Sequence, residues 1–211
     1  MAKPIGILGG TFDPVHHGHL RLATEVRELL DLAEVRLIPV HTPAHRHQPL
    51  ASGQHRLAML RLAVRGTSGL SVDDREIIRG GISYTVDTLK SLHGENIAPS
   101  LCLIMGMDAF RTLNTWHEWN VIPEYAHIIV ADREGAAVEF EHELIREFYS
   151  RRLCGDRSAI DKEAGKILKL NIPMLDISAT RIRQLLLEGR DPGFLLPDSV
   201  IKYIKRESLY S

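Results

Sequence analysis

Histidines cluster near the start of this chain, and their spacing suits the binding of an anion. Seven of the 11 histidines lie within the first 55 residues, three of them in the segment GGTFDPVHHGH at 9–19. His16 and His19 are three positions apart, so they face the same side of a helix that begins near them. The free N–H groups and positive dipole end of such a helix favour a phosphate, and imidazoles add donors there. The segment therefore favours a phosphate site.

Two other interpretations of this segment stay open. A glycine pair before a helix also suits a plain tight turn with solvated histidines. Histidines at i and i+3 can bind zinc, although no cysteine or third histidine has a matching spacing. The motifs G-x-G-x-x-G, Walker A, H-E-x-x-H, G-x-S-x-G and C-x-x-C do not occur in the sequence, which disfavours several common enzyme classes, the dinucleotide-binding dehydrogenases among them.

A second segment with anion-binding chemistry is ISATRIRQLLLEG at 177–189. Ser178 is a good N-cap for a helix there, and Gly189 is a good stop. Arg181 and Arg183 fall near the positive end of this helix, where a cation is disfavoured by about 0.3–1 kcal/mol. An anion bound at this end would offset that cost. We expect Arg181 to extend into solvent, and Ser178 and Arg183 to hold phosphate oxygens through charge-assisted hydrogen bonds.

Alternating strands and helices must position these two segments. Apolar runs predict buried strands at 5–8, 35–40, 101–106 and 127–132, and a weaker one from residue 70. Periodic apolar residues predict helices from about 18, from about 54, and at 83–93, 138–153, 178–188 and 197–206, with a loop at 41–53. This order predicts an α/β fold with a Rossmann-like, doubly wound parallel sheet, whose ligands bind beyond the carboxyl ends of the strands. We expect a single domain over 1–211, with a helical C-terminal segment from about residue 178.

Composition limits the partners of this domain. Its 211 residues are 44% hydrophobic and 25% charged, as in ordinary soluble proteins. The net charge of -1 disfavours nucleic acid, and no apolar run approaches the roughly 20 residues of a membrane span. Two cysteines suit the reducing cytoplasm. A homo-oligomer is compatible with the sequence. We expect Cys102 in the core, Trp119 as a core or subunit-contact aromatic, and Asp73 with Asp74 in a solvated turn.

The two anion-binding segments resemble the paired signatures of one nucleotidyltransferase superfamily, here GTFDPVHHGH at 10–19 and ISATRIR at 177–183. Three further stretches are similar to bacterial nicotinate-nucleotide adenylyltransferase, and the resemblance extends along nearly the whole chain: VDDREIIRGGISYTVDTL at 72–89, LCLIMGMDAF with TWHEW at 101–119, and HIIVADR at 127–133. The resemblance implies the nucleotidylyl transferase type of fold. It also implies transfer of the adenylyl group of ATP to nicotinate mononucleotide, giving nicotinate adenine dinucleotide and pyrophosphate in NAD biosynthesis.

The resemblance also implies roles for individual residues. The ATP phosphates would be held from both signatures, with His16, His19 and Arg183 as the catalytic groups and His19 closest to the α-phosphate: Gly9, Gly10, Thr11, Phe12, His16, His19, Ser178, Thr180 and Arg183. The adenosine would lie against Gly106, Asp108, Asp132 and Arg133. The attacking group is a 5′-phosphate that is already anionic, so no general base is expected. Mg²⁺ is the expected metal, bridging phosphate oxygens with few protein ligands.

The pyridine nucleotide would lie against Trp116. Its carboxylate would be received by Thr85 and by the backbone around Val86 and His117, and its phosphate by His45 and Arg46. The chain departs from the family at position 117, which is often a larger aromatic, and at Pro43–Ala44, where a proline pair is usual. Two alternatives remain: nicotinamide mononucleotide as the acceptor, and a non-catalytic nucleotide sensor of the same fold.

Overall fold

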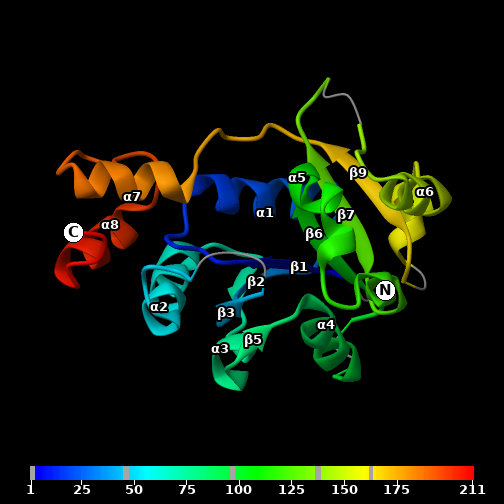
Figure 1. The fold of residues 1–211 in the computed structure, drawn as a ribbon, viewed down its shortest axis with the longest axis horizontal. Coiled ribbons are helices and arrows are strands. Elements are labelled where there is room, and N and C mark those ends of the chain that lie inside the picture. Colours follow the sequence, from blue (N-terminus) through cyan, green and yellow to red (C-terminus); the bar gives the residue numbers. More distant parts are fainter. Residues whose placement is uncertain (1–2, 45–47, 96–97, 136–138, 162–163) are drawn as a thin grey trace.

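A seven-stranded sheet forms the centre of the molecule in a computed structural model that describes residues 3–44, 48–95, 98–135, 139–161 and 164–211 (Figure 1). Its spatial order is β4-β2-β1-β6-β7-β9-β8, and every neighbouring pair is parallel. The strands are β1 (Ile5–Gly10), β2 (Glu34–Pro39), β4 (Leu70–Val72), β6 (Leu101–Gly106), β7 (His127–Asp132), β8 (Leu153–Cys154) and β9 (Ile167–Asn171). The strand order reverses direction between β1 and β6. The predicted doubly wound sheet is confirmed, and its switch point lies beyond Gly10 and Gly106.

Helices cover both faces of this sheet, because side chains alternate along each buried strand. Cys102 and Ile104 pack with α1 and α7 in one core, whereas Leu101, Leu103 and Met105 pack with α4 and α6 in the other. The helices are α1 (His17–Leu29), α2 (Gly53–Val64), α3 (Arg75–Arg79), α4 (Thr85–Gly94), α5 (Met107–Arg111), α6 (Glu143–Arg152), α7 (Ala179–Leu187) and α8 (Asp198–Arg206). Short 3₁₀ turns η1 (Leu113–Thr115), η2 (Trp119–Glu124) and η3 (Arg157–Asp161) connect some of them, and a small sheet pairs β3 (Thr42–Pro43) with β5 (Ile82–Ser83).

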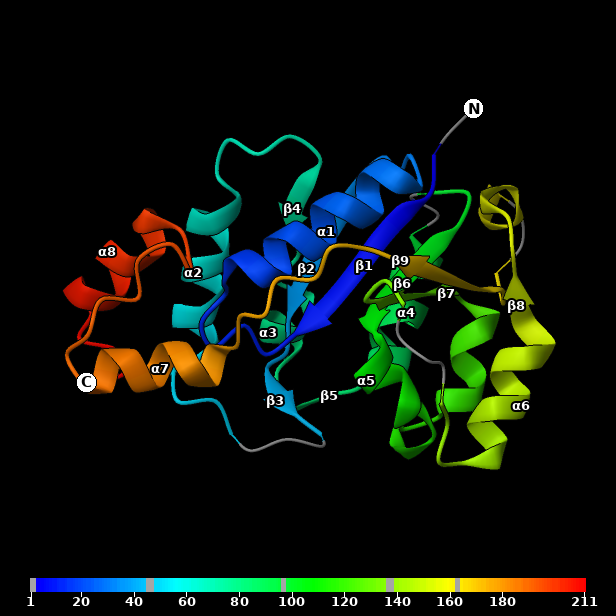
Figure 2. The ribbon, with the colours of Figure 1, turned by 90° about the horizontal axis from the view of Figure 1, so that it is seen from above.

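The connection from β9 to α7 brings the second signature to the first. Residues 172–178 run without helix or strand structure from β9 across the molecule to α7, passing the start of α1 (Figure 2). Helices α7 and α8 then pack beside α2, at the end of the molecule away from α6. The start of α7 therefore lies beside the turn that follows β1.

The prediction of a helix over 138–153 is wrong at its start, because α6 begins only at Glu143. Phe140 turns inward instead, and its ring lies 6.0 Å from that of Phe110 and 5.1 Å from that of Tyr149. Arg111 also donates to the carbonyl of Glu139 at 3.1 Å. These tertiary contacts hold 139–142 out of the helix.

Several short elements carry no clear sequence pattern, among them β3 inside the predicted loop at 41–53. Strand β9, ILKLN, is interrupted by polar residues, and α3 has only five residues.

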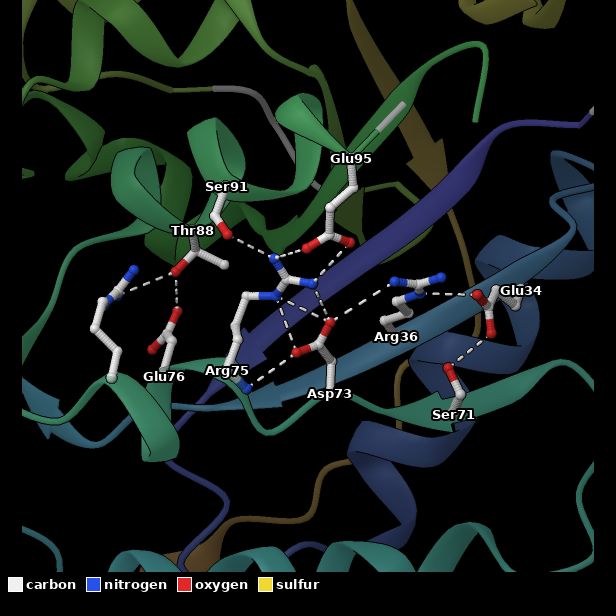
Figure 3. Close-up of polar contacts among 10 residues, drawn as sticks. Glu34, Arg36, Ser71, Asp73, Arg75, Glu76, Thr88, Ser91 and Glu95 are labelled. Carbon is white, nitrogen blue, oxygen red and sulfur yellow. Dashed lines mark hydrogen bonds and ion pairs between the residues drawn. The ribbon is translucent and has the colours of Figure 1, made fainter. Parts of the chain in front are cut away.

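The expectation of a solvated turn is wrong for Asp73. Its carboxylate accepts from Arg75 Nη2 at 2.7 Å and lies 3.7 Å from Arg36 Nη1 (Figure 3). Arg75 in turn reaches Glu95 of the segment after α4 at 3.0 Å. Asp73 therefore links β4 to two neighbouring elements.

The expectations for Cys102 and Trp119 agree with the structure. Cys102 is wholly buried in β6, and the ring of Trp119 packs edge-on against Phe148 with centroids 5.1 Å apart. In the described parts of the chain, we find no helix with the length and apolar character to cross a bilayer.

Candidate active site

The turn after β1 forms the floor of the candidate site. Gly9 and Gly10 end the strand, Thr11 is half-buried, and Phe12 is buried with a left-handed φ of 50°. The Phe12 ring meets His19 edge-on, with centroids 4.9 Å apart. The chain thus turns sharply after β1, and the Phe12 side chain packs beneath the first turn of α1. The backbone of this turn lies at the switch point, where it can approach a ligand closely.

His16 and His19 lie together at the start of α1. His16 is the N-cap, and its ring stacks on that of His19 with centroids 3.7 Å apart. The His16 backbone N–H donates to His19 Nδ1 at 3.3 Å, which sets the orientation of the second ring. Burial, with a smaller effect of His17, lowers the pKa of His16 to about 4. His16 is therefore neutral at physiological pH. Its Nδ1 is buried without a hydrogen-bond partner among the described residues.

Helix α7 brings Arg183 to the same place from the other end of the sequence. Ser178 caps this helix by accepting from the Arg181 N–H at 3.2 Å, as predicted. Arg183 Nη1 donates to the backbone carbonyl of Asp13 at 2.6 Å, and its Nη2 donates to Thr180 Oγ1 at 3.3 Å. Arg181 is exposed, as expected. The structure therefore joins the two predicted phosphate segments, which lie 170 positions apart at this contact.

Gly106 and Asp108 lie at the end of the neighbouring strand. Gly106 is the N-cap of the short helix α5, across the switch point from β1. The Asp108 side chain is fully exposed and pairs with Arg111 at 3.1 Å. Both residues thus lie at the carboxyl edge of β6, where their predicted contact with adenosine would be made.

Asp132 and Arg133 differ in their surroundings. The Asp132 carboxylate is buried: one oxygen accepts from the Arg133 N–H at 2.9 Å, and the other lies 3.1 Å from Lys169 Nζ of β9. Arg133 extends outward and lies 3.3 Å from the Asp176 carboxylate. The Asp132 side chain is therefore already engaged, whereas the Arg133 side chain is accessible.

The predicted pyridine-nucleotide residues gather at the start of α4. Thr85 begins this helix, and Val86 is wholly buried, so only its backbone can meet a ligand. The exposed His117 ring lies 4.3 Å from that of Tyr84, and Trp116 is half-buried next to it in sequence. This contact brings Thr85 near the segment of Trp116. The other two predicted residues, His45 and Arg46, lie outside the described residues.

Sequence reasoning missed a polar cluster beneath the turn that follows β1, which consists of the buried Asp13 and Arg56 and the half-buried Tyr210. The Asp13 carboxylate accepts from the Tyr210 hydroxyl at 2.6 Å, and Arg56 is 1% exposed. Arg56 donates to four backbone carbonyls, those of Thr11, Val40, His41 and Ala51, at 2.7–3.2 Å. The available signal was a charged residue inside an otherwise buried run, such as Asp13 between Phe12 and Val15.

The described residues contain no group of three or more His, Cys, Asp or Glu side chains placed to hold a metal ion. The site instead offers imidazoles, a guanidinium, hydroxyls and backbone N–H groups. Such donors bind anions rather than hard cations, which take oxygen ligands. This donor set fits a divalent ion that arrives on phosphate oxygens and needs few protein ligands.

Comparison with known proteins decides the family. The cytidylyltransferase-like family model matches residues 7–185. A probable nicotinate-nucleotide adenylyltransferase of Pseudomonas entomophila is 49% identical over 99% of this chain and 95% of its own length. One of the same name from Aeromonas salmonicida is 46% identical over 100% of this chain and 98% of its own.

The chain belongs to the nicotinate-nucleotide adenylyltransferase family. Its fold also matches a solved Plasmodium falciparum nicotinic acid mononucleotide adenylyltransferase complexed with NaAD, with a TM-score of 0.74 and 20% identity over 99% of this chain and 97% of that one. This likeness shows the shared fold. Membership of the adenylyltransferase family makes this chain a nucleotidyltransferase enzyme.

Proposed function

We propose that this chain transfers the adenylyl group of ATP to nicotinate mononucleotide, releasing pyrophosphate and giving nicotinate adenine dinucleotide for NAD biosynthesis. The observation that carries the proposal is the contact of Arg183 with the Asp13 carbonyl, because it places a guanidinium beside the turn that leads into His16 and His19. The relatives named above are called nicotinate-nucleotide adenylyltransferases, which supports the choice of substrates.

The triphosphate would lie between the β1 turn and the start of α7. Gly9, Gly10, Thr11 and Phe12 would approach it with their backbone, and the side chains of His16, His19, Ser178, Thr180 and Arg183 would complete its binding. Adenosine would extend toward Gly106, Asp108, Arg133 and the backbone of Asp132. The nicotinate ring would meet Trp116, with its carboxylate at Thr85 and at backbone N–H groups near Val86 and His117.

The proposed chemistry is positioning and charge neutralisation. The acceptor phosphate is already anionic, so no side chain has to remove a proton from it. Arg183 and the imidazole donors would stabilise negative charge on the α-phosphate and on the departing pyrophosphate. Two donors of Arg183 already bond to Asp13 and Thr180, and this fixes the plane of the guanidinium before ATP binds.

Mg²⁺ is the metal we propose for this site. It would be held mainly by the phosphate oxygens of ATP, because the carboxylate in the turn after β1, that of Asp13, is buried and already accepts three hydrogen bonds. When bound, it would neutralise charge on the pyrophosphate. The free thiols of Cys102 and Cys154 agree with the cytoplasm as the proposed location.

One experiment tests the function and its acceptor: pyrophosphate release from ATP with either nicotinate mononucleotide or nicotinamide mononucleotide. A carboxylate is satisfied by N–H donors alone, whereas a carboxamide also needs an acceptor for its NH₂ group. We expect kcat/KM to favour nicotinate mononucleotide. Equal values would contradict the acceptor preference, and no release with either acceptor would leave a nucleotide sensor as the better description.

A further inference from the structure

A partly buried hydrogen bond joins the turn that follows β1 to the segment that follows α8. The Tyr210 hydroxyl donates to Asp13 Oδ1 at 2.6 Å across 197 positions of sequence. Tyr210 takes a left-handed φ of 63°, which is unfavourable for residues other than glycine. The chain thus adopts an unfavourable conformation where this side chain reaches inward. A tyrosine hydroxyl is a donor at neutral pH, and burial raises the pKa of Tyr210 further.

The Asp13 carboxylate is an acceptor for several parts of the chain at once. Besides Tyr210, it accepts from the backbone N–H groups of Leu50 at 2.8 Å and Ala51 at 3.1 Å. It is 5% exposed, so bulk water does not replace a donor that is lost. The position of Asp13 therefore depends on all three donors together.

Asp13 in turn orients Arg183. The backbone carbonyl of Asp13 accepts from Arg183 Nη1 at 2.6 Å, and one oxygen of its carboxylate lies 3.9 Å from the same nitrogen. A rotation or shift of Asp13 would move this carbonyl and change the direction of the guanidinium. Tyr210, Asp13 and Arg183 therefore form a continuous chain of contacts that ends on the cation proposed to face the triphosphate.

We propose that Tyr210 is a positioning residue for adenylyl transfer, acting through Asp13 to hold Arg183 toward the ATP phosphates. The inference rests on the proposed use of ATP, but it concerns a residue outside the proposed contacts with either substrate. Its effect is on ATP rather than on the acceptor, since Arg183 belongs to the phosphate side of the site.

The test is Tyr210→Phe, which removes one hydroxyl and keeps the ring. The matched control is Tyr203→Phe in α8, because the Tyr203 hydroxyl bonds His55 Nδ1 at 2.9 Å and is not bonded to Asp13. We expect Tyr210→Phe to lower kcat/KM for ATP about tenfold and ATP affinity about fivefold, while KM for nicotinate mononucleotide stays within twofold. We expect the control to match wild type in all three.

The melting temperature of each variant separates positioning from stability. A lower Tm for Tyr210→Phe with unchanged ATP parameters would overturn the inference, and so would equal losses in both variants. Calorimetric titration with ATP alone requires no acceptor, so it tests Tyr210 even if the proposed acceptor is wrong. A wild-type protein that binds ATP but releases no pyrophosphate would contradict the proposed function, whereas equal ATP affinities of wild type and Tyr210→Phe would contradict the role of Tyr210.

Discussion

His16 and His19 stack ring on ring at the start of α1, with centroids 3.7 Å apart. The two rings have different surroundings. His16 is 6% exposed and its low pKa keeps it neutral, whereas His19 is half-buried and oriented by a backbone N–H. We infer that His16 supports the ring of His19 and that His19 is the imidazole nearer to bound phosphate.

The first prediction concerns His19. Replacement by alanine removes a donor from the transition state, so we expect His19→Ala to lower kcat by at least about 100-fold. Steady-state pyrophosphate release measures this. His17→Ala is the control, because His17 lies outside the proposed site, and it should stay within a few-fold of wild type. Turnover like that of wild type in His19→Ala would remove this residue from the mechanism.

The second prediction concerns stability at acid pH. The pKa of His16 is about 4 in the folded protein and about 6.5 in the unfolded chain, so the unfolded chain binds more protons between these values. The contribution of His16 to the free energy of unfolding is therefore fully present above about pH 6.5. It is lost as the pH falls toward 4, by up to about 3 kcal/mol. Urea unfolding of wild type and His16→Asn from pH 7 to pH 4 measures the difference. A variant that loses as much stability as wild type would contradict this assignment.

The third prediction concerns Arg56. Arg56→Met leaves four backbone carbonyls without their donor and removes one of the two cations near Asp13, so we expect a loss of about 3–5 kcal/mol in the free energy of unfolding. Arg61→Met is the control on the same helix. Arg61 forms an exposed pair with Asp74, worth less than about 1 kcal/mol. Comparable losses in the two variants would show that the Arg56 contacts contribute little.

The fourth prediction compares two neighbouring aspartates. Asp73 is shielded between Arg75 and Arg36, whereas Asp74 pairs only with Arg61 in the described contacts (Figure 3). We expect Asp73→Ala to destabilise the protein by about 1–2 kcal/mol and Asp74→Ala by less than about 0.5 kcal/mol. Chemical denaturation of both variants checks the order. Equal effects would mean that the Asp73 network is no stronger than a surface ion pair.

The sequence predicted those elements whose burial leaves a simple pattern. Strands β1, β6 and β7 lie inside a sheet covered on both faces, so they are continuously apolar and can be recognised. Strand β9 could not be recognised in this way, because Lys169 interrupts its apolar run. That lysine is the ion-pair partner of Asp132 on β7, a contact that only the pairing of the two strands reveals.

The same distinction, between a local sequence pattern and contacts made only in the folded chain, applies to the candidate site. His16 and His19 could be selected because they stand at the start of α1, where the backbone itself favours an anion, and Arg183 because it lies in the first half of α7. Asp13, Arg56 and Tyr210 could not be selected in the same way. Their interactions are long-range hydrogen bonds to backbone groups and to each other, and no local spacing encodes which distant segments will meet.

The contact between Asp13 and Arg183 also has a consequence for the order of folding. The two residues are 170 positions apart, and the connection between them runs through both halves of the sheet. Contacts of such long sequence separation carry a high loop-closure cost, so they tend to form late in folding. We therefore expect ATP binding to return last during refolding from denaturant, after helical circular dichroism has recovered. In this protein, the recovery of ATP binding would therefore indicate that both halves of the molecule have assembled.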